Sequence, residues 1–299
     1  MFDTEKMIDI LIPTVAQGLL WALLALGVYI TFRVLDIADL SVEGSFPLGA
    51  AVAATALVNG YGMLIAFFLA AIAGALAGIV TGFFTTRLKI PALLAGILTM
   101  IGLYSVNLHV MGKANVALLR VDTIFSYAES FGMSATVAML TVGVVAAVFI
   151  GCLMYWFFGT EIGTAIRATG CNSQMARAQG VNTNRMIVLG LLISNALVAL
   201  SGALVAQSNG FADVGMGTGT IVIGLASVII GEVLFGTKSF KNCLISVILG
   251  SIVYRLVIAV VLQLGMPPND LKLFTALLVA LALSMPLIRE KWRERQRRA

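Results

Sequence analysis

The stretch Gly231–Ser239, GEVLFGTKS, comes nearer than any other part of the chain to a nucleotide-binding motif. A P-loop holds phosphate on backbone N–H groups and on the lysine of Gly-x4-Gly-Lys-Ser/Thr. Here Thr237 separates the second glycine from Lys238, and the stretch ends an apolar run. HExxH and GxSxG motifs are also missing from the sequence. We therefore expect no catalytic residues and no cofactor in this chain.

The metal-binding residue types are equally sparse. The chain has three cysteines, Cys152, Cys171 and Cys243, without CxxC spacing, and one histidine, His109. Zinc sites and disulfide frameworks need several such residues at short, regular spacings. The sequence therefore predicts neither.

The composition indicates that lipid surrounds most of the chain. Of the 299 residues, 60% are hydrophobic and 11% are charged, with a mean hydropathy of +1.03. Soluble domains have about 45–50% apolar and about 25% charged residues. The formal charge of +5 does not point to nucleic acid, because the basic residues lie at the ends of apolar runs. In that position they are topology signals of a membrane protein.

The sequence predicts an all-α, polytopic membrane protein with about eight to ten spans, each of about 20 apolar residues. We expect nine: Ile8–Thr31, Ser41–Asn59, Tyr61–Thr85, Ile90–Val110, Ala135–Phe158, Met186–Ser208, Thr218–Phe235, Cys243–Leu264 and Lys272–Ile288. The second and fourth are the weakest. The second begins with Glu43, Gly44 and Pro47, which favour a broken or re-entrant segment.

The distribution of lysine and arginine predicts the orientation. If the basic tail 289–299 is cytoplasmic, alternation places most of the 19 lysines and arginines on the inside, as the positive-inside rule requires. The N-terminus is then outside. Residues 159–185 become the longest cytoplasmic loop within a single transmembrane domain, 1–299.

Five polar residues inside or near predicted spans are candidates for a translocation pathway: Glu43, Ser45, Asn107, Arg255 and Glu232. Ionisable groups at membrane depth are costly and usually face the protein interior or a water-filled cavity. Arg255 and Glu232 either pair with each other or line the pathway. Asn107 is better explained by hydrogen bonding between helices, and for Glu43 structural and pathway roles remain open.

A stripe of small residues, Gly74, Gly78 and Gly82, recurs every four residues in the third predicted span. In lipid such a stripe lets two helix backbones approach closely. Packing within the chain is the favoured explanation, and a subunit interface is the alternative.

The polar insert in the middle of the chain is too long for an unstructured connector. We expect two short helices, Glu161–Ala168 and Ser173–Gln179, with Asn172 as the N-cap of the second. Gly170 and Gly180 are expected to end them. The insert is either a solvated connector or a rigid docking element for a cytoplasmic partner.

The insert resembles the cytoplasmic coupling loop of ABC-importer permeases of the branched-chain amino acid and ribose permease family. The matching residues are Gly163, Ala165, Arg167, Ala168, Asn172, Ala176, Gly180, Val181 and Asn182. Further similar stretches are Asp36–Ala54, Ser194–Ala206 and Gly224–Gly236. The resemblance implies contact with an ATPase through Arg167, Asn172, Met175, Ala176, Arg177, Gln179 and Gly180.

The same resemblance implies a type II ABC importer-like permease in the bacterial inner membrane. Its expected partners are a second permease copy, cytoplasmic ATPase subunits that hold ATP and Mg, an external solute-binding protein, and the lipid bilayer. The stretch DLSVEGSF is most similar to permeases for aromatic amino acids, whereas many relatives have His-Gly where this chain has Glu43-Gly44. The alternatives are a secondary transporter driven by an ion gradient and a membrane scaffold that does not transport.

Overall fold

The computed structural model describes residues 4–298, which form a bundle of α-helices with one small β-ladder. In chain order the elements are α1 (Thr4–Tyr29), a π-helical turn η1 (Ile30–Val34), α2 (Val42–Val58), α3 (Met63–Thr86), α4 (Ala92–Met111), β1 (Asn115–Ala117), α5 (Ile124–Glu129), α6 (Ala135–Phe158), α7 (Glu161–Cys171), α8 (Ser173–Ala178), α9 (Thr183–Asn209), β2 (Phe211–Asp213), α10 (Thr220–Phe235), α11 (Phe240–Gln263), a 3-10 turn η2 (Pro268–Asp270) and α12 (Leu271–Arg298).

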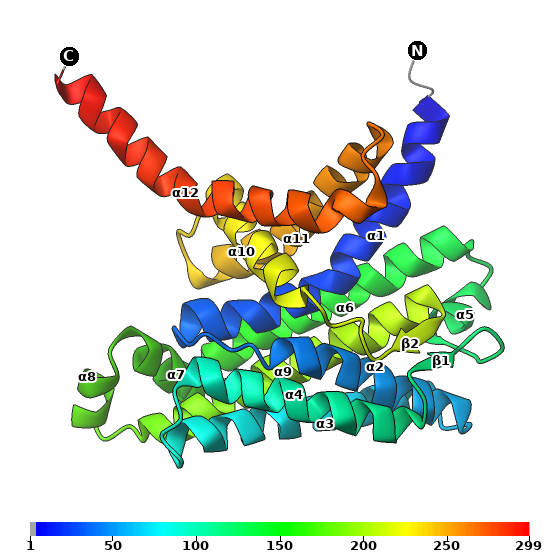
Figure 1. Cartoon of the computed structure of the whole chain (residues 1–299), viewed down its shortest axis with the longest axis horizontal. Coiled ribbons are helices and arrows are strands. Elements are labelled where there is room, and N and C mark those ends of the chain that lie inside the picture. The colour runs from blue at the N-terminus through cyan, green and yellow to red at the C-terminus, as the bar shows by residue number, and fades with distance from the viewer. Residues whose placement is uncertain (1–3, 299) are drawn as a thin grey trace.

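The short elements gather at the two ends of the bundle. Figure 1 shows α7 and α8 at one end and the β1–β2 ladder with α5 at the other. The ladder is antiparallel and pairs Val116 with Ala212. The predicted basic tail continues α12 as helix as far as Arg298, and Ala299 lies outside the described residues.

Helices α1 and α9 form the centre of the bundle. The predicted glycine stripe of α3 faces α9: a Cβ atom built on Gly74, Gly78 or Gly82 would collide with α9. Close backbone approach replaces side-chain interdigitation at this contact and maximises van der Waals contact in lipid. The prediction that the stripe packs within the chain is confirmed.

The helices differ from the predicted count of nine spans. Within residues 4–298, seven helices are long and apolar enough to cross a membrane. The predicted fourth span is one of them, as α4. The other two predicted spans correspond to shorter apolar helices, α2 with 17 residues and α10 with 16 residues. The predicted count of nine spans is therefore not confirmed. Each of the two short helices follows a non-helical segment, 35–41 before α2 and 214–219 before α10.

Helices α2 and α10 both begin deep inside the bundle. Asp39, just before α2, contacts Asn195, which lies near the middle of the 27-residue α9. Gly219, just before α10, donates its N–H to Glu43 in the first turn of α2. From this meeting point α2 runs towards the β-ladder, whereas α10 runs towards α12 (Figure 1). The predicted break at Glu43, Gly44 and Pro47 is therefore wrong, because α2 is helical through all three residues, and the non-helical backbone precedes α2.

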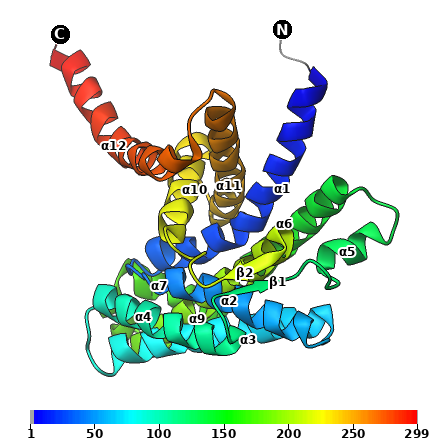
Figure 2. The same ribbon diagram turned by 45° about the vertical axis from the view of Figure 1, so that its right-hand side comes forward.

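Helix α12 stands at the edge of the molecule and packs mainly on α10. Figure 2 shows α10, α11 and α12 grouped on one side of α1, with α2, α3 and α4 on the other. Most of the large apolar side chains of α12, including Leu273, Leu277 and Leu281, are exposed on this chain. Apolar exposure of this extent is expected of a helix that meets lipid or another subunit.

Candidate functional site

The α7–α8 unit is held rigid by side-chain caps at three successive helix starts. Thr160, Asn172 and Asn182 each accept a hydrogen bond from a backbone N–H of the helix that follows. The Asn172 Oδ1 to Met175 N distance is 3.0 Å. Gly180 has a φ of +86° after α8, a conformation that glycine adopts at little cost. The predicted caps at Asn172 and Gly180 are therefore confirmed.

Gly170 does not end the first short helix as expected. It lies inside α7, which continues to Cys171. A Cβ atom on Gly170 would overlap the backbone of Val34 and Leu35 at the end of η1. The glycine is needed for this close approach between α7 and the end of α1, and not for a left-handed helix end. A sequence pattern cannot distinguish these two uses.

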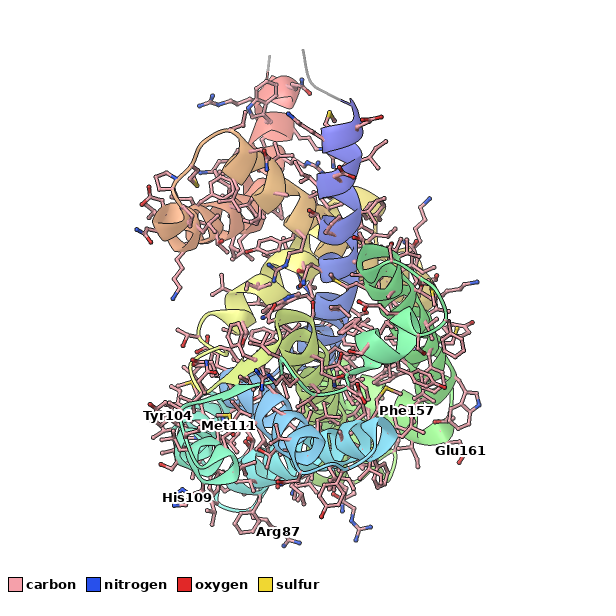
Figure 3. All side chains as sticks on the ribbon, turned by 90° about the vertical axis from the view of Figure 1, so that its right-hand side faces the viewer. Arg87, Tyr104, His109, Met111, Phe157 and Glu161 are labelled. Carbon is pink, nitrogen blue, oxygen red and sulfur yellow. The ribbon has the colours of Figure 1, made fainter. Side chains whose placement is uncertain are left out.

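The N-terminal end of α7 packs equally closely against the end of α6. Figure 3 labels Phe157 and Glu161, which flank the junction between α6 and α7. A Cβ atom on Gly163 would collide with the backbone of Phe157 and Phe158. Helix α7 is thus clamped between the ends of α6 and α1, so a displacement of α7 must move both.

Most of the residues expected to contact an ATPase are exposed: Arg167, Asn172, Met175, Arg177, Gln179 and Gly180. Ala176 is 2% exposed and packs inward, so it supports the unit and does not present a contact surface. Arg177 Nε donates to Thr183 Oγ1 at 2.8 Å and so ties α8 to the start of α9. Met175, 52% exposed, is the large apolar side chain at the tip.

Arg167 faces away from that tip. Its guanidinium lies 4.5 Å from the ring centre of Phe240, at the start of α11. Both residues line a cavity of about 620 Å³ together with Trp156 and Lys241. Arg167 therefore occupies the hollow between α6, α7 and α11, apart from the other predicted contact residues.

A fully buried polar network joins the segment before α2 to α9. Its members, Asp39, Ser41, Ser45 and Asn195, are all 0% exposed. Asp39 Oδ1 accepts from the Ser41 backbone and hydroxyl, and Asp39 Oδ2 accepts from Asn195 Nδ2 at 3.1 Å. Ser45 Oγ donates to Asn195 Oδ1. Buried polar groups are tolerated in lipid when satisfied in this way, and the network fixes where α2 begins.

Glu43 lies where the starts of α2 and α10 meet. Its Oε1 accepts from the backbone N–H of Gly219 at 3.2 Å. A carboxylate at a helix N-terminus is stabilised by the unpaired N–H groups and the positive end of the helix dipole. Discontinuous helices that meet at mid-membrane are a recurrent feature of transporter substrate sites. Of the five pathway candidates, Glu43 and Ser45 both lie in the first turn of α2, where Glu43 faces Gly219 and Ser45 faces Asn195.

Asn107 also reaches the first turn of α2, and of the two alternatives for Glu232 and Arg255, pairing with each other is wrong. Glu232 pairs with Arg33, at the end of α1, at 2.7 Å, and not with Arg255. Asn107 Nδ2 donates to the Gly44 carbonyl at 3.4 Å, an interhelical contact of the expected kind.

Arg255 has aromatic neighbours instead of an acidic one. Its guanidinium carbon lies 4.3 Å from the Trp21 ring centre and 5.9 Å from that of Tyr254. Trp21 in turn stacks on Phe46, with ring centres 4.9 Å apart. Since Phe46 lies one helical turn after Glu43, this stack leads from Arg255 to the first turn of α2.

Sequence reasoning missed Asp39, Asn195 and Trp21. Asp39 directly precedes an apolar run, and a carboxylate in that position is an available signal of a buried acid. Asn195 lies within an otherwise apolar helix, which is also an available signal. Nothing in the sequence indicates that Trp21 meets Arg255, because 234 positions separate them.

A family model described as "Branched-chain amino acid transport system / permease component" matches residues 10–283. A solved structure described as an inward-facing conformation of a metal-chelate type ABC transporter is similar over 97% of this chain and 90% of its own. Its TM-score is 0.50 and its sequence identity 15%, which supports the fold alone.

Two curated relatives match at closer range. A "Tyrosine transport system permease protein" from Clostridioides difficile (strain R20291) is 41% identical over 270 residues, which cover 90% of this chain and 88% of the relative. An uncharacterized protein from Rickettsia prowazekii (strain Madrid E) is 33% identical over 285 residues, covering 92% and 97% respectively.

Proposed function

Because the chain belongs to the family of branched-chain amino acid transport system permease components, we propose that it is the transmembrane subunit of an importer driven by ATP hydrolysis on a separate chain. Membership of the family supports the first part of the proposal, that the chain is a membrane permease of an ABC transporter. The ATPase, the external binding protein and a second permease copy are the partners that the proposal adds.

The observation that carries the proposal is the α7–α8 unit. It is capped at three helix starts, clamped between α6 and α1, and exposed at its tip. A flexible connector would need none of these features. A unit that receives force from an ATPase needs all of them, because only a stiff element transmits a displacement.

The expected mechanism follows from what the unit contacts. Gly170 of α7 abuts Val34 and Leu35. Four residues after Leu35 comes Asp39, which is bonded to Asn195 at mid-bundle. Displacement of α7 therefore pulls directly on the segment that positions the start of α2. We propose that ATP-driven movement of the unit rearranges the meeting point of α2 and α10 and so switches access across the membrane.

The proposed solute is an amino acid. The name of the Clostridioides relative specifies tyrosine transport, which favours an aromatic amino acid and agrees with the similarity of the DLSVEGSF stretch. Selectivity in such an importer rests largely with the external binding protein, so this part of the proposal depends on that partner.

Replacement of Met175 by glutamate tests the docking role. The side chain is exposed, so the substitution leaves the fold intact but places charge in an apolar contact. We expect Met175→Glu to lower co-purification of the ATPase and ATP-dependent uptake of L-tyrosine in liposomes by about tenfold or more, as for loss of an interface anchor. Arg177→Glu is less clean, because it also breaks the bond to Thr183.

The matched control is Leu119→Glu. Leu119 is 86% exposed in the turn after β1, at the opposite end of the bundle. Normal ATPase binding and uptake by Met175→Glu would contradict the docking role. Uptake by the wild-type chain without any ATPase, sustained by an ion gradient, would favour the secondary transporter instead.

A further inference from the structure

The guanidinium of Arg255 lies inside the helix bundle. One turn before it on α11, Ser251 donates to the Gly18 carbonyl of α1, and Arg255 itself lies over Trp21 of the same helix. Arg255 is half-buried as a residue, but its Nε and Nη2 atoms are inaccessible. These two nitrogens have no hydrogen-bond partner among residues 4–298.

The acidic side chains of the bundle interior are engaged elsewhere. Asp39 is held by Ser41 and Asn195. Glu43 accepts from the backbone of Gly219, and Glu232 pairs with Arg33. A buried cation without an anion is costly, and breaking or omitting its partner is strongly unfavourable. The part of the chain that the structure describes therefore leaves Arg255 with a charge that something else must balance.

The two unpaired nitrogens of the Arg255 guanidinium indicate which chemical group balances its charge. Nε and Nη2 lie on one side of the planar group, and their N–H bonds point in the same direction. This pair of donors matches the two oxygens of a carboxylate and forms two parallel, charge-assisted hydrogen bonds. Trp21 covers the face of the guanidinium and holds its plane, so the edge has a defined direction.

We propose that Arg255 binds the carboxylate of the transported solute, which restricts the solutes of this permease to compounds that carry a carboxylate. The inference rests on the proposed function. Because this chain covers Nε and Nη2 in the present conformation, the carboxylate reaches them in another conformation of the transport cycle. The site is linked through Trp21 and Phe46 to the first turn of α2, the element that the α7–α8 unit is proposed to move.

The test uses the complete transporter in liposomes, with its ATPase and binding protein, and radiolabelled L-tyrosine as the probe. Arg255→Met removes the charge and the donors, whereas Arg255→Lys keeps only the charge. We expect Arg255→Met to lose about 90% or more of uptake, a tenfold effect, while binding-protein-stimulated ATP hydrolysis stays within about twofold. Arg255→Lys should be intermediate. The thermal midpoint of Arg255→Met should equal or exceed that of the wild type, because an unpaired buried charge is removed.

A purely structural role predicts the opposite pattern. Uptake and ATP hydrolysis would then fall together, and the thermal midpoint would drop in both Arg255 variants. Arg33→Met is the comparison for an arginine that has its own acidic partner: it leaves Glu232 unpaired, so its thermal midpoint should fall, whereas that of Arg255→Met should not.

Three further outcomes overturn the inference. Wild-type uptake by both Arg255 variants would exclude the role directly. Dissociation of the permease pair in Arg255→Met would assign the carboxylate to the second copy of the chain. A native solute without a carboxylate, identified by mass spectrometry on the binding protein, would also refute it. Absence of ATP-dependent uptake by the wild-type transporter would instead refute the proposed function, so the two failures are distinguishable.

Discussion

At the scale of single residues, the absence of a side chain at Gly170 lets the backbone of α7 pack directly on the backbone at the end of η1. Alanine is the better helix former by about 1 kcal/mol in an exposed helix interior. At Gly170, however, a Cβ atom would overlap the Val34 carbonyl, and backbone cannot move aside as a flexible side chain can. The steric cost therefore exceeds the gain in helix propensity, since overpacking costs about 1–3 kcal/mol or more.

Gly170→Ala is accordingly expected to lower the thermal midpoint of the purified permease and to reduce ATP-dependent uptake. The control is Gly102→Ala in α4, where nothing lies within 4 Å of the added atom. That variant should be as stable as the wild type or slightly more stable. Equal midpoints for the two variants would mean that α7 does not pack on the end of α1 as described.

At the scale of elements, the network around Asn195 decides where α2 starts. Asn195 donates to Asp39 and to the Leu191 carbonyl, and accepts from Ser45. Removing the amide leaves a fully buried carboxylate short of a donor, at a cost of about 1–3 kcal/mol or more. Asn195→Ala should therefore destabilise the permease and loosen the segment before α2.

The comparison for Asn195→Ala is Asn107→Ala. Asn107 is also buried, but it makes one long hydrogen bond and its Oδ1 has no partner among the described residues. We expect Asn195→Ala to lower the thermal midpoint by several degrees more than Asn107→Ala does. The reverse order would show that the Asp39 network does not hold α2 in place.

The positions of the helices, but not the starts of α2 and α10, could be predicted from the sequence. Hydropathy predicts a helix wherever about 20 apolar residues follow one another. It cannot show that 35–41 and 214–219 remain non-helical inside the bundle, because distant residues satisfy their polar groups: Glu43 accepts from the Gly219 backbone, and Asn195 donates to the Asp39 side chain.

The candidate site was predictable to a similar extent. Polarity within apolar runs identifies Glu43, Ser45 and Arg255 as residues that need partners. It does not identify the partners, since Arg33 and Glu232 are 199 positions apart in the chain. The residues that cap α8, Asn172 and Gly180, were predictable because a cap bonds to backbone only a few residues away.

At the scale of the whole molecule, the coupling proposal needs the α7–α8 unit on the cytoplasmic side. The same orientation places the β-ladder and α5 outside, at the opposite end of the bundle (Figure 1). Exposed Cys171 in α7 and exposed Leu119 after β1 report on the two ends. One variant would retain Cys171 alone, with Cys152 and Cys243 replaced by serine. The other would carry Leu119→Cys with all three native cysteines replaced.

A membrane-impermeant maleimide is expected to label Leu119→Cys in intact spheroplasts and Cys171 only after permeabilisation. The positive-inside rule is the physical reason, because it retains the basic segments around α7 and the tail of α12 in the cytoplasm. Labelling of Cys171 in intact spheroplasts would place the unit outside, beyond the reach of any ATPase. The rigid caps, the clamp on α1 and the link to Asp39 would then require a different explanation, since no cytoplasmic force could act on them.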